Sequence, residues 1–245
     1  MTDAAGAPTY QGLIDEALFR PVRSGNAFED TVARLLQTIR LGIVEPGSAL
    51  PSERDLATRF SVSRDTVRDA IRELAQAGYV ESRRGRYGGT FVAESLPLPV
   101  PHESPELDAD EIEQVLGLRE VVEAGAVRAA ARRPLTAVER DALWTRLRET
   151  AAAAPEDYRR LDSRLHLTFA EVTGIPALVG LVADSRSHVN ELLDRIPLLS
   201  PNIAHSNAQH EAIVVAILRG DEQAAAEAML EHLAGSAALL RGFLA

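Results

Sequence analysis

Four prolines fall within the ten residues from Leu96 to Pro105, and this run constrains the fold more than any other feature of the chain. Proline fixes its own φ angle and lacks the backbone N–H, so such a run continues neither a helix nor a central strand. The charge also changes here. Residues 20–94 hold 12 arginines and 10 acidic residues, whereas residues 95–245 hold 14 arginines and 23 acidic residues. We therefore predict a linker over 96–108 between a mildly basic domain and a strongly acidic one.

The remaining boundaries follow from this linker. We expect an N-terminal arm over 1–24, a first domain over 25–95 and a second domain over 109–245. The first twelve residues contain no basic residue and no apolar run, so they do not form a secretory signal. No stretch is apolar enough to span a membrane, so we expect a cytoplasmic protein. The absence of cysteine excludes disulfides, thiolate metal sites and a cysteine nucleophile.

The first domain is predicted to contain three helices followed by a hairpin. After a helix over 28–39, Ser52 is placed to cap a short helix over 52–60, and Ser63 to cap a second over 63–77. Strands are expected over 79–83 and 90–93, joined by a tip rich in arginine and glycine. Helix, tight turn, helix and two-stranded wing is the pattern of a winged helix-turn-helix, which binds DNA.

Arginine is concentrated where such a domain meets DNA. Arg64 and Arg68 lie one turn apart on the second helix, and the guanidinium fork suits guanine edges and phosphates. A basic but merely solvated surface is the alternative interpretation. The predicted DNA-binding residues are Arg54, Ser63, Arg64, Thr66, Arg68, Arg84, Gly85 and Arg86. The net charge of −10 therefore does not exclude nucleic acid, because the acidic excess lies outside this domain.

The second domain contains helical stripes and no strand signal. Prolines and glycines divide it into helices over 109–132, 136–151, 156–173, 176–195, 203–219 and 222–242. Short connections between amphipathic helices predict an antiparallel bundle. The predicted fold class is thus an α+β winged helix-turn-helix joined to an all-α bundle.

Three histidines and an aspartate in this bundle form a candidate metal site. Asp162 and His166 share one helix face, and His210 and His232 lie on the next two helices. Imidazoles with one carboxylate suit Zn, Mn, Ni, Co or Fe(II) better than calcium, and zinc is the ion expected on isolation. The alternative is that these are ordinary surface or core histidines.

Two sets of motifs resemble a known family. The segments Leu50–Ala57, Val62–Arg68 and Gly88–Val92 resemble the N-terminal domain of GntR-family bacterial transcription regulators. Asp162-x3-His166, the segment His210–Asp221 and Met229-x2-His232 resemble the FCD domain of the FadR-like branch of that family.

This resemblance implies several roles. It implies contacts with operator DNA by Arg54, Arg64 and Arg68 and by the wing tip near Arg84 and Gly85, with a homodimer on a pseudo-palindromic site in the bacterial nucleoid. It implies a divalent ion held by Asp162, His166, His210 and His232 on the floor of a cavity that takes a small carboxylate or hydroxy-acid. Arg119 is the candidate cation for that acid, although it could instead pair with Glu123 along its helix, and Asn190 is a further candidate.

We therefore predict a ligand-responsive dimeric transcription regulator that acts as a repressor and is not an enzyme. Three alternatives stay open on the sequence alone. The protein could be an activator or dual regulator, it could be a helical metalloenzyme with an accessory DNA-binding domain, or its metal could be purely structural.

Overall fold

The computed structural model describes residues 19, 21, 27–85, 88–97 and 109–244. The described residues separate into two compact units, one ending at residue 97 and one beginning at residue 109. Most of the predicted linker and all but residues 19 and 21 of the predicted N-terminal arm lie outside the described residues.

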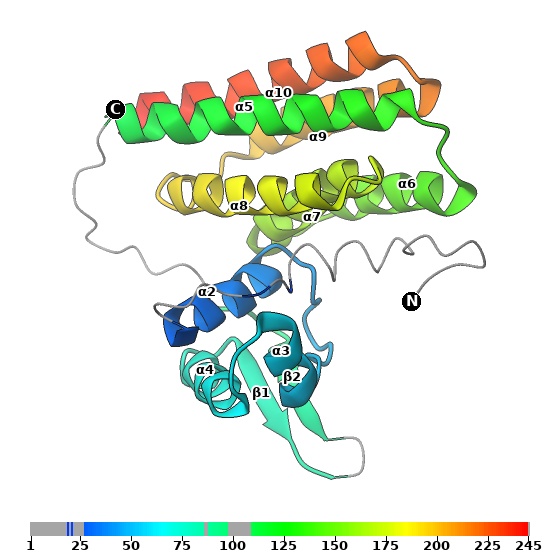
Figure 1. The fold of residues 1–245 in the computed structure, drawn as a ribbon. Helices are drawn as coiled ribbons and strands as arrows, with labels where there is room; N and C mark the ends of the chain where they lie inside the picture. The colour runs from blue at the N-terminus through cyan, green and yellow to red at the C-terminus, as the bar shows by residue number, and fades with distance from the viewer. Residues whose placement is uncertain (1–18, 20, 22–26, 86–87, 98–108, 245) are drawn as a thin grey trace. The chain divides into compact units, whose positions relative to one another are not determined.

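The first unit is a winged helix-turn-helix, as the sequence predicts (Figure 1). The two strands are antiparallel, with Val80 opposite Val92 and Arg83 opposite Gly89, and a single bridge joins Ala49 to Phe91. The elements are α2 (Ala27–Arg40), α3 (Glu53–Phe60), α4 (Arg64–Gln76), β1 (Val80–Arg83) and β2 (Gly89–Val92).

Local capping explains where the two short helices begin. The Ser52 hydroxyl accepts a hydrogen bond from the Asp55 amide, and the Ser63 hydroxyl accepts one from the Thr66 amide. Both predicted N-caps are thus confirmed. Between the helices Ser61 adopts a left-handed φ of 57°, which gives a turn of three residues. The apolar faces of the helices meet in one core that includes Leu35, Leu56, Phe60, Val67, Ile71 and Val92.

The wing depends on glycine at one position. A Cβ atom on Gly88 would lie 2.5 Å from the carbonyl oxygen of Arg83, so a larger residue would force the hairpin open. The Arg83 guanidinium lies 4.4 Å from the centre of the Phe91 ring and 2.6 Å from a Glu81 oxygen. Arg83 therefore stabilises the hairpin itself.

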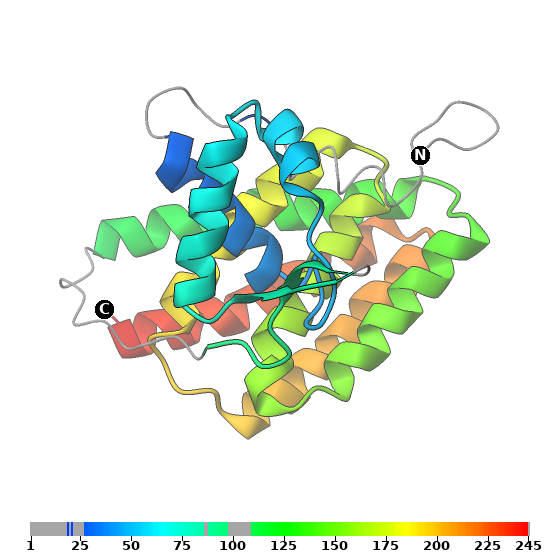
Figure 2. The same cartoon turned by 90° about the horizontal axis from the view of Figure 1, so that it is seen from below.

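The second unit consists of antiparallel helices without strands among its described residues (Figures 1 and 2). Helices α5 and α10 run side by side, α9 packs against α10, and α8 contacts α5 and α7. The helices are α5 (Ala109–Arg132), α6 (Ala137–Ala151), α7 (Pro155–Glu171), α8 (Pro176–Leu193), α9 (Ser200–Arg219) and α10 (Glu222–Leu244).

Helix α9 begins three residues earlier than predicted. We expected Pro197 to Pro201 to break the chain before a helix at 203, but Pro201 lies in the first turn of α9. Proline is tolerated there because the first amides of a helix have no intrahelical acceptor. Pro155 and Pro176 begin α7 and α8 in the same way.

The bundle encloses a large apolar core between α5, α6, α7, α9 and α10, which includes Val127, Leu143, Phe169, Ile213, Ile217 and Met229. A second apolar cluster joins the beginning of α5 to the ends of α8 and α10, through residues such as Ile112, Val189 and Leu240. None of the described helices is long and apolar enough to cross a membrane.

Candidate metal centre and DNA-binding surface

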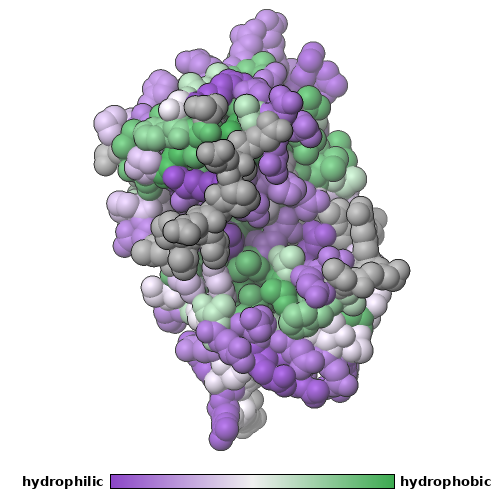
Figure 3. Space-filling view, turned by 90° about the vertical axis from the view of Figure 1, so that its left-hand side faces the viewer, coloured by the Kyte–Doolittle hydropathy of each residue, from purple (hydrophilic) through white to green (hydrophobic). Residues whose placement is uncertain are grey.

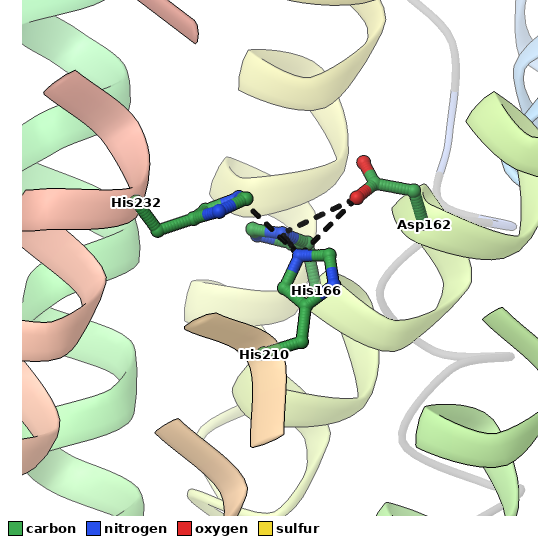
Figure 4. Close-up of side chains that lie close together, drawn as sticks. All are labelled: Asp162, His166, His210 and His232. Carbon is green, nitrogen blue, oxygen red and sulfur yellow. Dashed lines mark hydrogen bonds and ion pairs between the residues drawn. The ribbon is translucent and has the colours of Figure 1, made fainter. Parts of the chain in front are cut away.

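The structure brings together the four predicted metal ligands. Asp162 and His166 project from α7, His210 from α9 and His232 from α10 (Figure 4). One nitrogen or oxygen atom from each lies within 4.8 Å of the corresponding atoms of the others, and all four residues are buried. The helical periodicity explains this, because each histidine occupies a position in the inward stripe of its helix.

The distances between the converging atoms are those of ligands around one ion. Nε2 of His210 lies 3.2 Å from Nε2 of His166 and 3.3 Å from Nε2 of His232. The same nitrogen lies 3.3 Å from Oδ1 of Asp162, and Nε2 of His166 lies 3.8 Å from that oxygen. Two ligands each about 2.1 Å from an ion stand about 3.0 Å apart at a right angle and about 3.4 Å apart at the tetrahedral angle. A divalent ion therefore fits between these side chains.

The outer nitrogens of two rings have acceptors. Nδ1 of His166 meets Oε2 of Glu123, and Nδ1 of His232 lies 3.3 Å from Oε1 of Gln209. A ring that donates from Nδ1 carries its lone pair on Nε2. The lone pairs of His166 and His232 are therefore directed at the centre of the cluster, where a cation would stabilise them.

Two arginines and two carboxylates surround the histidines in the buried interior. Arg186 on α8 binds Oδ2 of Asp162, and this leaves Oδ1 facing the histidines. Arg119 on α5 donates from Nε to Oε1 of Glu123 at 2.9 Å and from Nη1 to the Ser236 hydroxyl at 2.7 Å. These four ionic side chains balance, with two positive and two negative charges.

Burial and neighbouring charges set the protonation of this cluster. Burial lowers the pKa of His210 from 6.5 to about 3, although Asp162 opposes the change. Burial, with His210 nearby, also lowers the pKa of His232 well below its usual value. Burial alone would raise the pKa of Asp162, but Arg186 and His166 hold it below its ordinary value. At neutral pH the cluster therefore presents neutral imidazoles at His210 and His232 and an ionised carboxylate, the forms that bind a metal.

A cavity of about 70 Å³ lies next to the cluster. Its polar lining residues are Arg119, Tyr158, Arg159, Asp162, Asn202, Ser206, His232 and Ser236. Leu193, Ile196, Leu199, Ile203 and Leu239 line its apolar part. The apolar part lies where α8 and α10 end and α9 begins, and hydrophobic side chains gather on the surface of this end of the helical unit (Figure 3).

The structure locates both predicted effector-binding residues. Arg119 forms the ion pair with Glu123 and also lines the cavity, so the pairing alternative is observed while acid binding by this side chain stays a prediction. Asn190 is buried but is not among the residues that line the cavity. Its side-chain amide donates to the Ser163 hydroxyl at 2.8 Å, and its carbonyl oxygen has no partner among the described residues.

The sequence analysis did not predict a role for Arg186 in this cluster, and it did not predict the contact between Glu123 and His166. Arg186 is fully buried, and it follows Val182 by four residues and precedes Val189 by three, within the inward stripe of α8. An arginine inside an apolar stripe is the signal that would have found it. Glu123 was considered only as a partner of Arg119, and its second oxygen, which holds His166, follows only from the fold.

The predicted DNA-binding residues lie on the exposed side of the first unit. The side chain of Arg54 is 80% exposed, and Arg64 and Arg84 are exposed as well. Arg68 is exposed and donates to Asp65 at 2.7 Å. Gly85 has a φ of 110°, which suits glycine at the wing tip. The hydroxyl groups of Ser63 and Thr66 form a hydrogen bond of 2.8 Å at the first turn of α4. Arg86 lies outside the described residues.

The fold and the two sites define a class of protein: a DNA-binding domain joined to a helical domain with a metal-ligand cluster and a cavity. Comparisons with known proteins agree. Residues 28–92 match the model of "Bacterial regulatory proteins, gntR family", and residues 114–235 match that of the FCD domain. The chain therefore belongs to the GntR family of transcriptional regulators and carries an FCD domain.

Relatives are similar over most of the chain. The "Putative L-lactate dehydrogenase operon regulatory protein" of Escherichia coli is 29% identical, with 87% of this chain and 84% of the relative covered. The "Uxu operon transcriptional regulator" of Escherichia coli is 31% identical, covering 77% and 76%. The solved structure of E. coli McbR/YncC shares the fold with a TM-score of 0.56 at 16% identity, covering 88% of this chain and 97% of that one. The two curated relatives are named as regulators of operons, and the chain shares their family, so the metalloenzyme alternative is set aside.

Proposed function

We propose that this regulator binds a small organic acid at a divalent ion held by Asp162, His166, His210 and His232, and that the acid changes its affinity for operator DNA. The observation that carries the proposal is the convergence of three imidazoles and one carboxylate oxygen beside a cavity that also contains Arg119. When bound, the ion would supply open coordination positions for carboxylate or hydroxyl oxygens. Zinc is the ion expected on isolation, with Ni, Mn, Co and Fe as the other candidates.

Charge balance favours an anionic effector. Without an ion, the buried positive charges of Arg119 and Arg186 are matched by those of Asp162 and Glu123. A divalent ion adds two positive charges in a region screened from water, where an unbalanced charge is costly. A carboxylate in the adjoining cavity would reduce that excess, and Arg119 lies at the cavity wall to meet it.

The shape and lining of the cavity favour a small acid with a short apolar part. A volume of about 70 Å³ holds only a few heavy atoms. Tyr158, Ser206 and Ser236 line the cavity, and their hydroxyls can meet oxygens of the ligand. The name of one relative refers to a lactate dehydrogenase operon, and lactate is an acid of this size and kind.

On DNA we propose that α4 reads the major groove while the wing meets the flanking backbone. Arg64 and Arg68 are directed outwards from the first two turns of α4, and Arg54 lies exposed on α3. Ser63, Thr66, Arg84, Gly85 and Arg86 complete the proposed surface. One such domain reads one half-site, so we propose a homodimer on a pseudo-palindromic operator and a repressor that the acid releases.

Thermal-shift measurements test the ligand part directly. A panel of small carboxylic acids is added to the zinc-loaded protein and to protein treated with a chelator. We expect stabilisation by at least one acid only in the metal-loaded protein, because ligand binding to the folded state raises its stability. The His210→Ala variant should lose both metal, measured by elemental analysis, and the response. His188→Ala, which changes an exposed histidine on α8, is the matched control and should keep both.

Operator binding tests the regulatory part. The purified protein, with metal, is titrated onto DNA from its own promoter region with and without the stabilising acid. Weaker binding with the acid, together with reporter expression that rises when the acid is supplied, is the result expected of a repressor. Full metal occupancy in His210→Ala, or acid binding that is indifferent to the chelator, would refute the proposed site.

A further inference from the structure

The outer face of α5 carries apolar side chains that nothing in the described residues covers. Val121 lies at the middle of the helix and is 73% exposed, and Leu118 is 49% exposed. Gly117 and Gly125 stand one turn to either side of Val121, and a Cβ atom added to either would meet no atom within 4 Å. Glycine inside a helix costs about 1 kcal/mol relative to alanine, yet no packing within the described residues requires it here.

Seven exposed positions lie along one line of this face, with the exposed side chains of Leu118, Glu113 and Glu120 beside it. From one end to the other the seven are Asp110, Gln114, Gly117, Val121, Gly125, Arg128 and Arg132. The steps between them are four, three, four, four, three and four residues, which keeps them on one line of the helix surface. Val121 stands at the centre of this line.

The two ends of the line carry opposite charges at equal distances from Val121. Asp110 precedes Val121 by eleven residues and Arg132 follows it by eleven, while Gln114 and Arg128 stand seven residues away on either side. If two α5 helices pack antiparallel about a two-fold axis at Val121, each Asp110 meets an Arg132 and each Gln114 meets an Arg128. Gly117 of one helix then meets Gly125 of the other, which lets the two backbones approach closely.

Resting on the homodimer of the proposed function, we infer that the outer face of α5 is the surface through which two copies of this chain associate in the helical domain. The occupant is a second copy because Asp110 and Arg132 would pair with each other about a two-fold axis at Val121, and the glycines on either side of Val121 would face each other there. Arg128 and Arg132 already lie 3.7 and 2.6 Å from Glu222, but both arginines stay more than half exposed and can take a further partner.

Light scattering on the full-length protein tests this surface. The wild-type protein should have twice the chain mass of 26.5 kDa. Val121→Glu places two like charges at the two-fold axis and should raise the dimer dissociation constant by about 100-fold or more, so that monomer appears at micromolar concentration. Val138→Glu, at a valine that is 67% exposed on α6, is the matched control and should stay dimeric.

Two further variants separate the interface from general damage to the fold. Because the chain contains no cysteine, Val121→Cys should give a disulfide-linked dimer on oxidation, whereas Val138→Cys should not. Asp110→Arg and Arg132→Asp should each weaken the dimer, and the double variant should restore it because the pairs are reversed together.

The outcomes distinguish the interface from the dimer itself. A dimeric wild-type protein with Val121→Glu equally dimeric and no cross-link in Val121→Cys would overturn the α5 interface and leave the proposed function standing. A wild-type chain that stays monomeric both alone and on operator DNA would overturn the interface and the proposed homodimer together.

Discussion

Acidification should destabilise the metal-free helical unit at pH values where ordinary surface carboxylates still keep their charge. His210 carries the effect. In the unfolded chain it binds a proton below about pH 6.5, whereas burial in the folded protein lowers its pKa to about 3. Between these values the unfolded chain binds more protons than the folded protein, so the free energy of unfolding falls as the pH falls.

The size of the effect follows from the two pKa values. Relative to pH 8, the difference between 6.5 and about 3 removes about 2 kcal/mol from the free energy of unfolding at pH 5 through His210 alone. His232 acts in the same direction, because its pKa is also lowered. Asp162 and Glu123 have lowered pKa values too, so their contribution is lost only at more acidic pH. Between pH 8 and pH 5 the change in the free energy of unfolding therefore reports the contribution of the histidines and not that of these carboxylates.

Urea unfolding followed by tryptophan fluorescence measures this effect, because Trp144, the only tryptophan of the chain, packs against the core of the helical unit. His210→Gln removes the titrating ring and should reduce the loss between pH 8 and pH 5 by about 2 kcal/mol. His188→Gln, at an exposed position on α8, should leave the loss unchanged. A His210→Gln protein with the wild-type pH dependence would show that His210 is not held neutral by burial, and the reasoning would fail.

Three further predictions concern the two sites. Glu123→Gln should lower metal affinity by about 10- to 100-fold, measured by competition with a chelating dye, because the acceptor that orients His166 is weakened; unchanged affinity would contradict this. Arg64→Ala and Arg68→Ala should each weaken specific operator binding by about 1–3 kcal/mol in a titration, whereas Arg148→Ala, at an exposed position on α6, should not; equal binding by all three would remove α4 from the interface. Arg119→Ala should blunt release from the operator by the acid while leaving DNA affinity intact, and a normal response would exclude Arg119 from acid binding.

The elements of both units could be predicted because local signals coincide with the fold. Ser52 and Ser63 supply the capping oxygens that their positions suggest, and Gly78 and Gly220 follow helix ends with positive φ. The beginning of α9 was misplaced because a proline is compatible with both a break and a first helical turn. Packing decides whether such a proline precedes the helix or lies in its first turn, and the periodicity of the sequence gives no information about that packing.

The candidate metal ligands could be predicted only in part. Asp162 and His166 are recognisable as metal-binding residue types one helical turn apart, whereas His210 and His232 lie on other helices and the resemblance to the FCD domain supported their place in the set. Their supporting partners come from helices distant in sequence: Arg186 reaches Asp162 from α8, and Glu123 reaches His166 from α5. Carboxylates and arginines are common in the chain, so residue type alone does not identify the partners of the cluster. Only the packing of the helices shows that Arg186 and Glu123 are these partners.

Helix α5 links the two proposals of function and assembly. Its inner face holds Arg119 and Glu123, which connect the cavity to His166, and its outer face holds Val121 between them in sequence. If the proposed acid binds Arg119 from the cavity, it would compete with the bond to Glu123, and a rigid helix would carry a displacement of its inner face to its outer face. In a dimer built on α5, the spacing of the two DNA-binding domains would then depend on whether the acid is bound. Such a dependence would make operator affinity differ between the free and the acid-bound protein.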